Sequence, residues 1–168
     1  MIIRMHQLKV LVFGKQDSGK STLIRTMIPE AVAVDDRRRS MAVDIGRIEV
    51  DGTAFLFLGI PGRIPFRAPR ELMVGSSFCA LMLLDGRGPM DSEDRAILRG
   101  IISLNIPFMA VLNEKEDRLP WAVAETIKAF CRTCPNFMGV VKGSALSHGF
   151  SHRVLYEIQQ FICRCRAA

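Results

Sequence analysis

One run near the N-terminus has the residue types and the spacing of a phosphate-binding loop. Residues 14–21 read GKQDSGKS and match the pattern G-x-x-x-x-G-K-[ST]. Glycines let a backbone wrap closely around phosphate oxygens and present its N–H groups to them. Lys20 would reach the β- and γ-phosphates, and the Ser21 hydroxyl would bind Mg²⁺. The predicted phosphate-binding residues are Gly14, Lys15, Gln16, Asp17, Ser18, Gly19, Lys20, Ser21 and Thr22, with Mg²⁺ as the cofactor.

The flanking sequence places this loop between a strand and a helix. Residues 8–13 form a short, mostly apolar run, which predicts a buried strand. The apolar residues of 21–28 follow helical spacing, and Pro29 ends that helix. A helix N-terminus directly after the loop adds partial positive charge, which attracts phosphate. The motif therefore has the structural context that its chemistry requires.

The remaining elements alternate between strands and helices. Asp51-Gly52 joins two β-rich runs in a predicted hairpin at 46–58, and residues 60–77 predict an irregular loop with at most a short helix at 70–74. Further strands are predicted at 78–84, 108–112 and 138–141, and helices at 91–104, 120–132 and 151–163. This order predicts one α/β domain over residues 1–168. It would be a three-layer sandwich with a six-stranded, mostly parallel sheet, one antiparallel edge strand and helices on both faces.

Composition narrows the class of protein further. Of 168 residues, 49% are hydrophobic and 24% are charged, which excludes a disordered or low-complexity chain. The net charge of +6 suits anionic ligands but does not indicate a nucleic-acid partner. No apolar run approaches the ~18–20 residues of a membrane span. The odd count of 5 cysteines and the lack of a signal-peptide pattern lead us to expect a cytoplasmic protein.

Taken together in order, these motifs resemble the Ras-like small GTPase superfamily over nearly the whole chain. Residues 40–45, the Asp51-Gly52 hairpin and Pro61-Gly62 resemble the stretch from switch I to switch II. Within the superfamily, residues 43–48 and 58–62 are most similar to a bacterial and archaeal branch. That branch includes the gliding-motility polarity GTPase and related predicted Sar-like proteins.

The resemblance implies a GTP/GDP switch and gives individual residues roles. Ser21 and Ser40 would bind Mg²⁺, and the backbone N–H of Gly62 would contact the γ-phosphate. Lys20, Gly62 and Arg63 would form the catalytic set. An effector or regulator protein would bind the switch regions, residues 37–48 and 59–77.

Two departures from the family pattern concern catalysis. Gly59 stands where most Ras-like proteins have the aspartate of D-x-x-G, so a carboxylate near Mg²⁺ is missing unless Asp44 turns inward. Arg63 stands where the family has the glutamine that orients the attacking water, and arginine cannot accept the proton of that water. The resemblance therefore implies GTP hydrolysis that is slow or depends on a partner.

The base-binding loop also departs from the family. Asn113 matches the asparagine of N-K-x-D, but Glu114 replaces the lysine, and Glu116, with Asp117 beside it, replaces the aspartate. Glu116 could accept hydrogen bonds from guanine directly, or Asp117 could do so after a one-residue bulge. Lys115 could replace the lysine of the family motif. Residues 144–146 resemble the family's S-A-K loop. The predicted guanine-binding residues are Asn113, Lys115, Glu116, Asp117, Ser144, Ala145 and Leu146.

Two other functions stay open at this point. A pseudo-GTPase would keep the fold as an interaction module without nucleotide turnover, and Gly59 and Arg63 would then mark lost hydrolysis. A small P-loop kinase would prefer ATP and use an arginine-bearing lid. The kinase hypothesis leaves the loops at Asn113 and Ser144 unexplained, so we favour the guanine-nucleotide switch.

Overall fold

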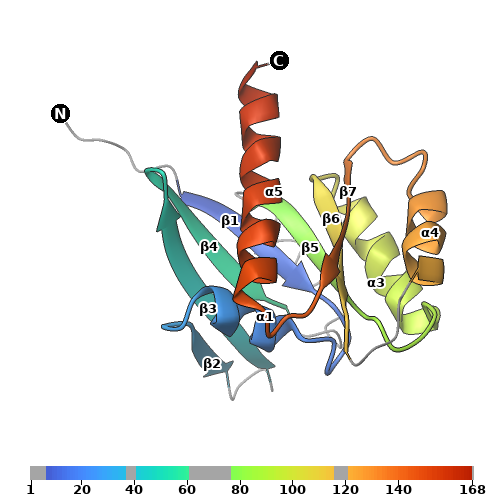
Figure 1. Cartoon of the computed structure of the whole chain (residues 1–168), viewed down its shortest axis with the longest axis horizontal. Coiled ribbons are helices and arrows are strands. Elements are labelled where there is room, and N and C mark those ends of the chain that lie inside the picture. The colour runs from blue at the N-terminus through green and yellow to red at the C-terminus, as the bar shows by residue number, and fades with distance from the viewer. Residues whose placement is uncertain (1–6, 37–40, 61–76, 116–120, 168) are drawn as a thin grey trace.

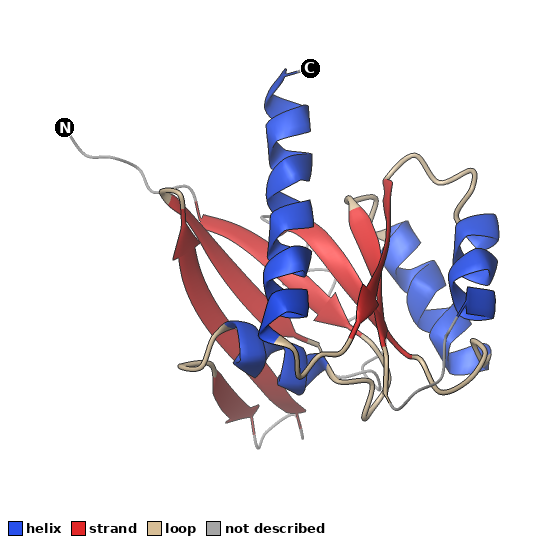
Figure 2. Cartoon of the chain, viewed as in Figure 1, coloured by secondary structure: helices blue, strands red, loops and turns tan. Residues whose placement is uncertain are grey.

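The computed structural model describes residues 7–36, 41–60, 77–115 and 121–167. In those ranges a central sheet carries helices on both faces (Figures 1 and 2). The strands are β1 (Gln7–Phe13), β2 (Val32–Asp36), β3 (Met41–Val50), β4 (Thr53–Gly59), β5 (Ser77–Asp85), β6 (Phe108–Asn113) and β7 (Phe137–Gly143). The helices are α1 (Lys20–Met27), α3 (Ser92–Ser103), α4 (Trp121–Phe130) and α5 (His148–Ala167). The predicted α/β sandwich is confirmed.

The sheet has the order β2-β3-β4-β1-β5-β6-β7. Strands β4, β1, β5, β6 and β7 pair in parallel, whereas β3 runs antiparallel to both β2 and β4. The prediction of six strands was wrong, because the described part of the chain forms 7. The hairpin strand is antiparallel as predicted, but β2 pairs along its outer side.

Strand β2 escaped prediction because an edge strand needs little hydrophobic patterning. It has 5 residues, and only one side of it pairs with a neighbour within the described sheet. Val32 and Val34 are 57% and 47% exposed, so they contribute little to the core. Sequence periodicity detects a strand through its buried face, and residues 32–34 of this strand are exposed.

The two faces of β1 show how the sandwich is held together. Val10 and Val12 point to the face covered by α1 and α5, while Leu11 and Phe13 point to the face covered by α3 and α4. All four side chains are buried. Successive residues of a strand alternate between faces, so an unbroken apolar run serves both layers at once. The end of β1 is thereby fixed in the centre of the molecule (Figure 1).

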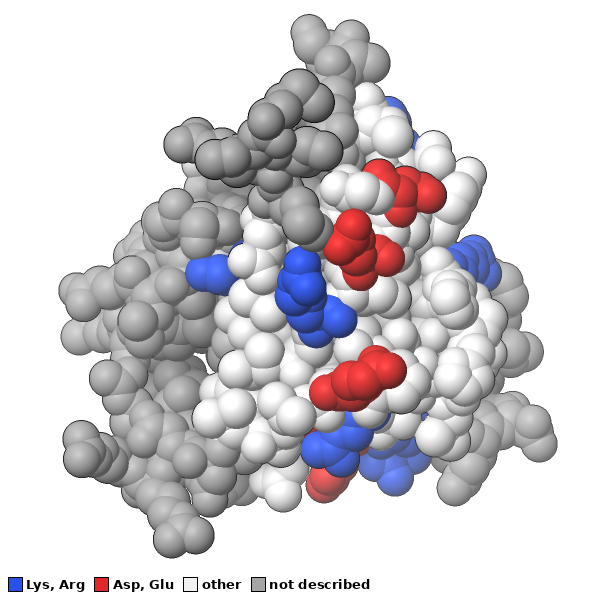
Figure 3. Space-filling model, turned by 90° about the vertical axis from the view of Figure 1, so that its left-hand side faces the viewer, with Lys and Arg blue, Asp and Glu red and all other residues white. Residues whose placement is uncertain are grey.

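None of the helices in the described ranges is both long enough and apolar enough to cross a bilayer. On the face that Figure 3 presents, the described lysines and arginines are interspersed with acidic side chains. The predicted loop at 60–77, with its short helix at 70–74, falls almost wholly outside the described residues.

Candidate functional site

The phosphate loop connects the end of β1 to the start of α1. Gly19 is the N-cap residue of α1 and has a φ of 102°, a left-handed conformation that favours glycine. A β-carbon at Gly19 would also collide with the side-chain amide nitrogen of Asn113. The second glycine of the motif is therefore required by both backbone conformation and space.

Lys20 holds the loop in a closed shape. Its Nζ donates hydrogen bonds to the carbonyl oxygens of Gly14, at 2.8 Å, and Lys15, at 2.6 Å. Burial lowers the pKa of Lys20, against the nearby negative charges of Asp44, Asp17 and Glu93. An anionic phosphate beside this ammonium would favour its charged form in the same way. The loop thus presents a partly desolvated cation at the start of α1.

A pocket of about 280 Å³ opens beside the loop. Its lining residues come from the loop, from the first turn of α1 and from the segment after β6: Asp17, Gly19, Lys20, Ser21, Thr22 and Lys115. The parallel strands β1, β5 and β6 all end at this edge of the sheet. Ligands of open α/β sheets bind outside the carboxyl ends of the strands, so the pocket lies where the fold favours a ligand.

Asn113, at the end of β6, ties this pocket to a neighbouring loop. Its Nδ2 donates to the carbonyl oxygen of Ser18 at 3.0 Å, and its Oδ1 accepts from the backbone N–H of Ala145 at 2.9 Å. The side chain is buried, with 3% of the residue exposed. The predicted phosphate loop and residues 144–146 are therefore joined through one amide group. Of that second loop, Ala145 is buried and Leu146 is 78% exposed.

Lys115 bends back over the phosphate loop. Its Nζ donates to the carbonyl oxygen of Asp17 and lies 3.5 Å from a carboxylate oxygen of Asp85 at the end of β5. Burial alone would raise the pKa of Asp85, but hydrogen bonds from Arg87 and the charge of Lys115 bring it below its usual range. Asp85 thus stays anionic and helps to hold Lys115 in the pocket wall. A lysine two residues after Asn113 can therefore contact both the phosphate loop and the end of β5.

Asp44 turns toward the phosphate loop from β3. Its Oδ2 accepts a hydrogen bond from the Ser21 hydroxyl at 2.5 Å, and its Oδ1 lies 3.1 Å from the Arg25 guanidinium. The Asp44 side chain is 12% exposed. A hydroxyl beside a carboxylate is a set of hard oxygen donors, which suits Mg²⁺ held between a protein and substrate phosphates. Ser21 and Asp44 therefore fit the ion that the motif predicts.

Lys15 faces away from the pocket, although it belongs to the predicted phosphate-binding set. Its Nζ lies 2.6 Å from Asp91 Oδ2 and 3.0 Å from Asp94 Oδ2, at the start of α3. These two aspartates also form a capping box, in which each side chain accepts from the other's backbone N–H. Burial would lower the pKa of Lys15, but the two hydrogen-bonded carboxylates raise it overall. Lys15 therefore ties the loop to α3, and the sequence motif alone did not predict this contact.

Several predicted site residues lie outside the described ranges: Ser40, Gly62, Arg63, Glu116 and Asp117. The switch regions 37–48 and 59–77 are described only at residues 41–48, 59–60 and 77. The magnesium role of Ser40, the catalytic roles of Gly62 and Arg63, and the choice between the two base-loop carboxylates stay predictions.

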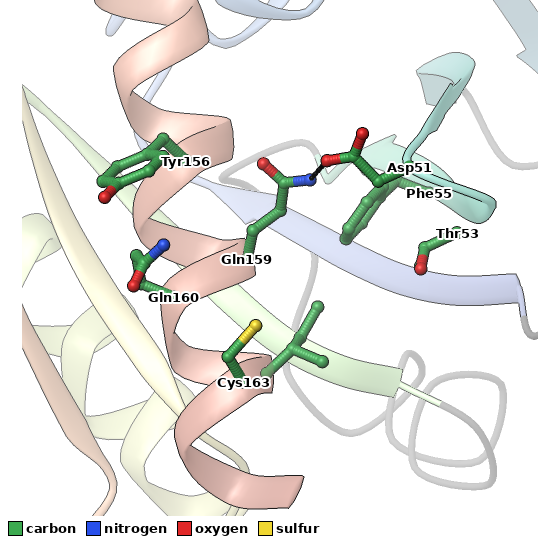
Figure 4. Close-up of a pocket in the computed structure, with 8 residues that line it drawn as sticks. Asp51, Thr53, Phe55, Tyr156, Gln159, Gln160 and Cys163 are labelled. Atoms are coloured by element: carbon green, nitrogen blue, oxygen red, sulfur yellow. Dashed lines mark hydrogen bonds between the residues drawn. The ribbon is translucent and has the colours of Figure 1, made fainter.

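A second cavity, also of about 280 Å³, lies at the other end of β4 (Figure 4). Asp51 and Phe55 face α5 there, and Gln159 Nε2 donates to Asp51 Oδ2 at 3.3 Å. Since β1 and β4 pair in parallel from Gln7 and Ala54 onward, this cavity is separated from the phosphate loop by the length of both strands. Sequence reasoning gave no signal for it.

Comparisons with known proteins agree with this geometry. Residues 9–114 match the family described as 50S ribosome-binding GTPase. An uncharacterized protein of Methanocaldococcus jannaschii is 31% identical over 144 residues, which cover 86% of this chain and 90% of that protein. GTPase Der of Campylobacter curvus is 25% identical over 128 residues, which cover 67% of this chain but only 27% of that protein.

Solved structures share the fold at low sequence identity. A bacterial selenocysteine-specific elongation factor aligns with a TM-score of 0.76 and 20% identity, covering 94% of this chain and 29% of that one. The G domain of the T. maritima FeoB iron transporter aligns with a TM-score of 0.67 and 14% identity, covering 94% and 99%. The family match spans more than half of the sequence and includes both the phosphate loop and Asn113. The chain therefore belongs to the 50S ribosome-binding GTPase family, and is a GTP-binding G domain of the P-loop GTPase superfamily.

Proposed function

We propose that this protein is a guanine-nucleotide switch of the Ras-like type, which binds GTP and GDP with Mg²⁺ at the phosphate loop. The observation that carries the proposal is the hydrogen-bonded bridge through Asn113. One buried side chain joins Ser18 of the phosphate loop to Ala145 of the loop after β7. A nucleotide whose phosphates lie on the first loop would have its base at the second. The bridge holds the two loops in the fixed relation that a phosphate site and a base site for one nucleotide require.

Guanine selectivity follows from the register of the base loop. Lys115 reaches back to the phosphate loop, although it stands one residue later than the lysine of N-K-x-D. This contact supports one extra residue after Asn113, which moves the family's aspartate position from Glu116 to Asp117. A carboxylate there would accept hydrogen bonds from guanine N1–H and from the exocyclic amine, which adenine does not offer together. We therefore propose Asp117 as the residue that selects guanine.

Magnesium would be held by Ser21 and, with GTP bound, by Ser40. The ion would neutralise charge on the β- and γ-phosphates. Lys20 would bind the same phosphates, and backbone N–H groups of the loop and of Gly62 would stabilise charge on the transferred group. Arg63 cannot orient water as a glutamine would, so hydrolysis is slow unless a partner supplies the missing group.

A partner protein would read the nucleotide state through residues 37–48 and 59–77. In P-loop switches these segments change when the γ-phosphate is present, because it holds them through Mg²⁺ and backbone contacts. Residues 41–48 of strand β3 belong to the first of these regions, and β3 pairs with β4 in the sheet next to the pocket. A change of the bound nucleotide could therefore be transmitted to the surface through β3.

The direct test is to identify and exchange the bound nucleotide. Purified protein is denatured, and the released nucleotide is separated by ion-exchange chromatography against standards. Affinities for fluorescent GDP and ADP analogues are then compared between the wild type, D117A and E116A. We expect guanine nucleotide on the wild type and loss of the guanine preference in D117A alone. Bound ATP or ADP would favour the kinase, and binding of GTP without turnover would favour the pseudo-GTPase.

A further inference from the structure

We propose that Asp44 is the carboxylate that positions Ser21 for Mg²⁺, and that this chain carries it on β3 rather than on β4. The inference rests on the proposed function, since it concerns the same magnesium site. In the family pattern this carboxylate belongs to the strand that leads into switch II, where Gly59 stands here. The described structure offers a substitute on the adjacent strand.

The strand register makes the substitution possible. Asp44 and Gly59 are directly opposite each other in the antiparallel β3–β4 pair. A β-carbon built on Gly59 would lie 3.3 Å from Asp44 Cβ and 3.5 Å from Asp44 Oδ2. Side chains of directly opposed residues stand on the same face of a sheet. The Asp44 carboxylate therefore occupies the space that an aspartate at position 59 would enter.

The contacts of Asp44 fix its orientation toward the loop. One carboxylate oxygen accepts from Ser21 Oγ at 2.5 Å, and the other pairs with Arg25 one helical turn further along α1. Partners that hold a metal-ligating side chain set its orientation and tune its affinity for the ion. With both oxygens engaged by the same helix, Asp44 holds the Ser21 hydroxyl at the pocket. Asp44 is thus a positioning residue for the magnesium site.

This arrangement changes which segment controls the ion. Ser40 and Asp44 are four residues apart in switch region 37–48, so both contributions to the magnesium site come from one stretch of chain. In the usual pattern the two are divided between switch I and switch II. Displacement of β3 would remove the Asp44 carboxylate from the site and so weaken the binding of Mg²⁺.

The experiment measures how nucleotide release depends on Mg²⁺, without requiring hydrolysis. Dissociation of a fluorescent GDP analogue is followed over a series of free Mg²⁺ concentrations, and the concentration that gives half of the full slowing is determined. In D44N, which keeps the shape but not the charge, we expect this concentration to rise about 10- to 100-fold. The matched control is E49Q, which removes the charge of an exposed carboxylate further along β3, where it pairs with Arg47, so its value should match the wild type.

A charge swap keeps the test decisive if D44N alone does not fold, which circular dichroism would reveal. The double variant D44G/G59D moves the carboxylate to β4 and empties the space that the Asp44 side chain occupies. Of the three atoms nearest to a β-carbon at position 59, two belong to Asp44 and are removed, and the third is the flexible end of Ile24, at 3.2 Å. We expect it to recover the wild-type magnesium dependence. A folded D44N with unchanged dependence, or a folded double variant that does not recover it, would overturn the role of Asp44 alone. A wild type that holds no guanine nucleotide at any Mg²⁺ concentration would overturn the proposed function as well.

Discussion

Removal of the Asn113 side chain should destabilise the protein even when no nucleotide is present. In N113A, the Ser18 carbonyl and the Ala145 N–H lose their buried partner, through bonds of 3.0 and 2.9 Å. A buried polar group left unsatisfied costs about 1–3 kcal/mol, so the two together cost about 2–6 kcal/mol. Domains of this size lose about 2–4 °C of melting temperature per kcal/mol, which predicts a fall of at least about 4 °C.

The assay is thermal unfolding followed by circular dichroism, with nucleotide first removed from each protein. A matched control is N136A, which deletes a hydrogen bond of similar length, 2.9 Å to Asn105, at an exposed site. Exposed substitutions of this kind usually stay within about 0.5 kcal/mol, so N136A should melt close to the wild type. If N113A had the same melting temperature as N136A, the Asn113 bridge would not stabilise the fold, and Asn113 would act only through the bound base.

Three further predictions concern other parts of the site. In K20A, the free energy of GDP binding should weaken by about 2–5 kcal/mol, because the partly buried ammonium at the phosphate site is removed. Equilibrium titration with a fluorescent GDP analogue measures this, and an unchanged affinity would contradict the assignment of the phosphate loop. In R63Q, single-turnover GTP hydrolysis should rise about 10-fold or more, because glutamine can orient the attacking water; an equal rate would show that Arg63 is not what limits hydrolysis. The Lys15–Asp91 pair should make stability fall in acid. A hydrogen bond from Lys15 lowers the pKa of Asp91 to about 2, so the pair stabilises the fold above pH 3.8, the ordinary pKa of this carboxyl, and this stabilisation is lost as the pH falls toward 2. Melting temperatures from pH 2.5 to 6 should therefore drop more steeply for the wild type than for K15M, and parallel curves would refute the link.

The acid response has an opposing component from the neighbouring carboxyl. Burial raises the pKa of Asp94 despite its hydrogen bond to Lys15, so the charged form of Asp94 costs stability above its unfolded pKa. The comparison with K15M isolates the contribution of the lysine, because both aspartates remain in both proteins.

Elements that depend on a local pattern of residues could be predicted from the amino-acid sequence. The short apolar run of β1, the glycine-containing loop and the amphipathic α1 follow from neighbouring residues alone, and so does the Asp51-Gly52 turn between β3 and β4. The phosphate loop could be assigned for the same reason, since all of its chemistry lies within eight consecutive residues. The α/β class then followed from the alternation of strands and helices.

Contacts between residues far apart in the chain could not be predicted in this way, because they depend on how the elements pack. Asn113 meets Ser18 across 95 residues, and Lys15 meets Asp91 across 76. Whether Asp44 turns inward could not be read from β3, because side-chain alternation gives two faces and only pairing with Gly59 selects one. Strand register and sheet order bring these groups together, and neither is encoded in any short run of residues. The phosphate loop could therefore be identified from a short run of residues, whereas the rest of the site forms only when the chain folds.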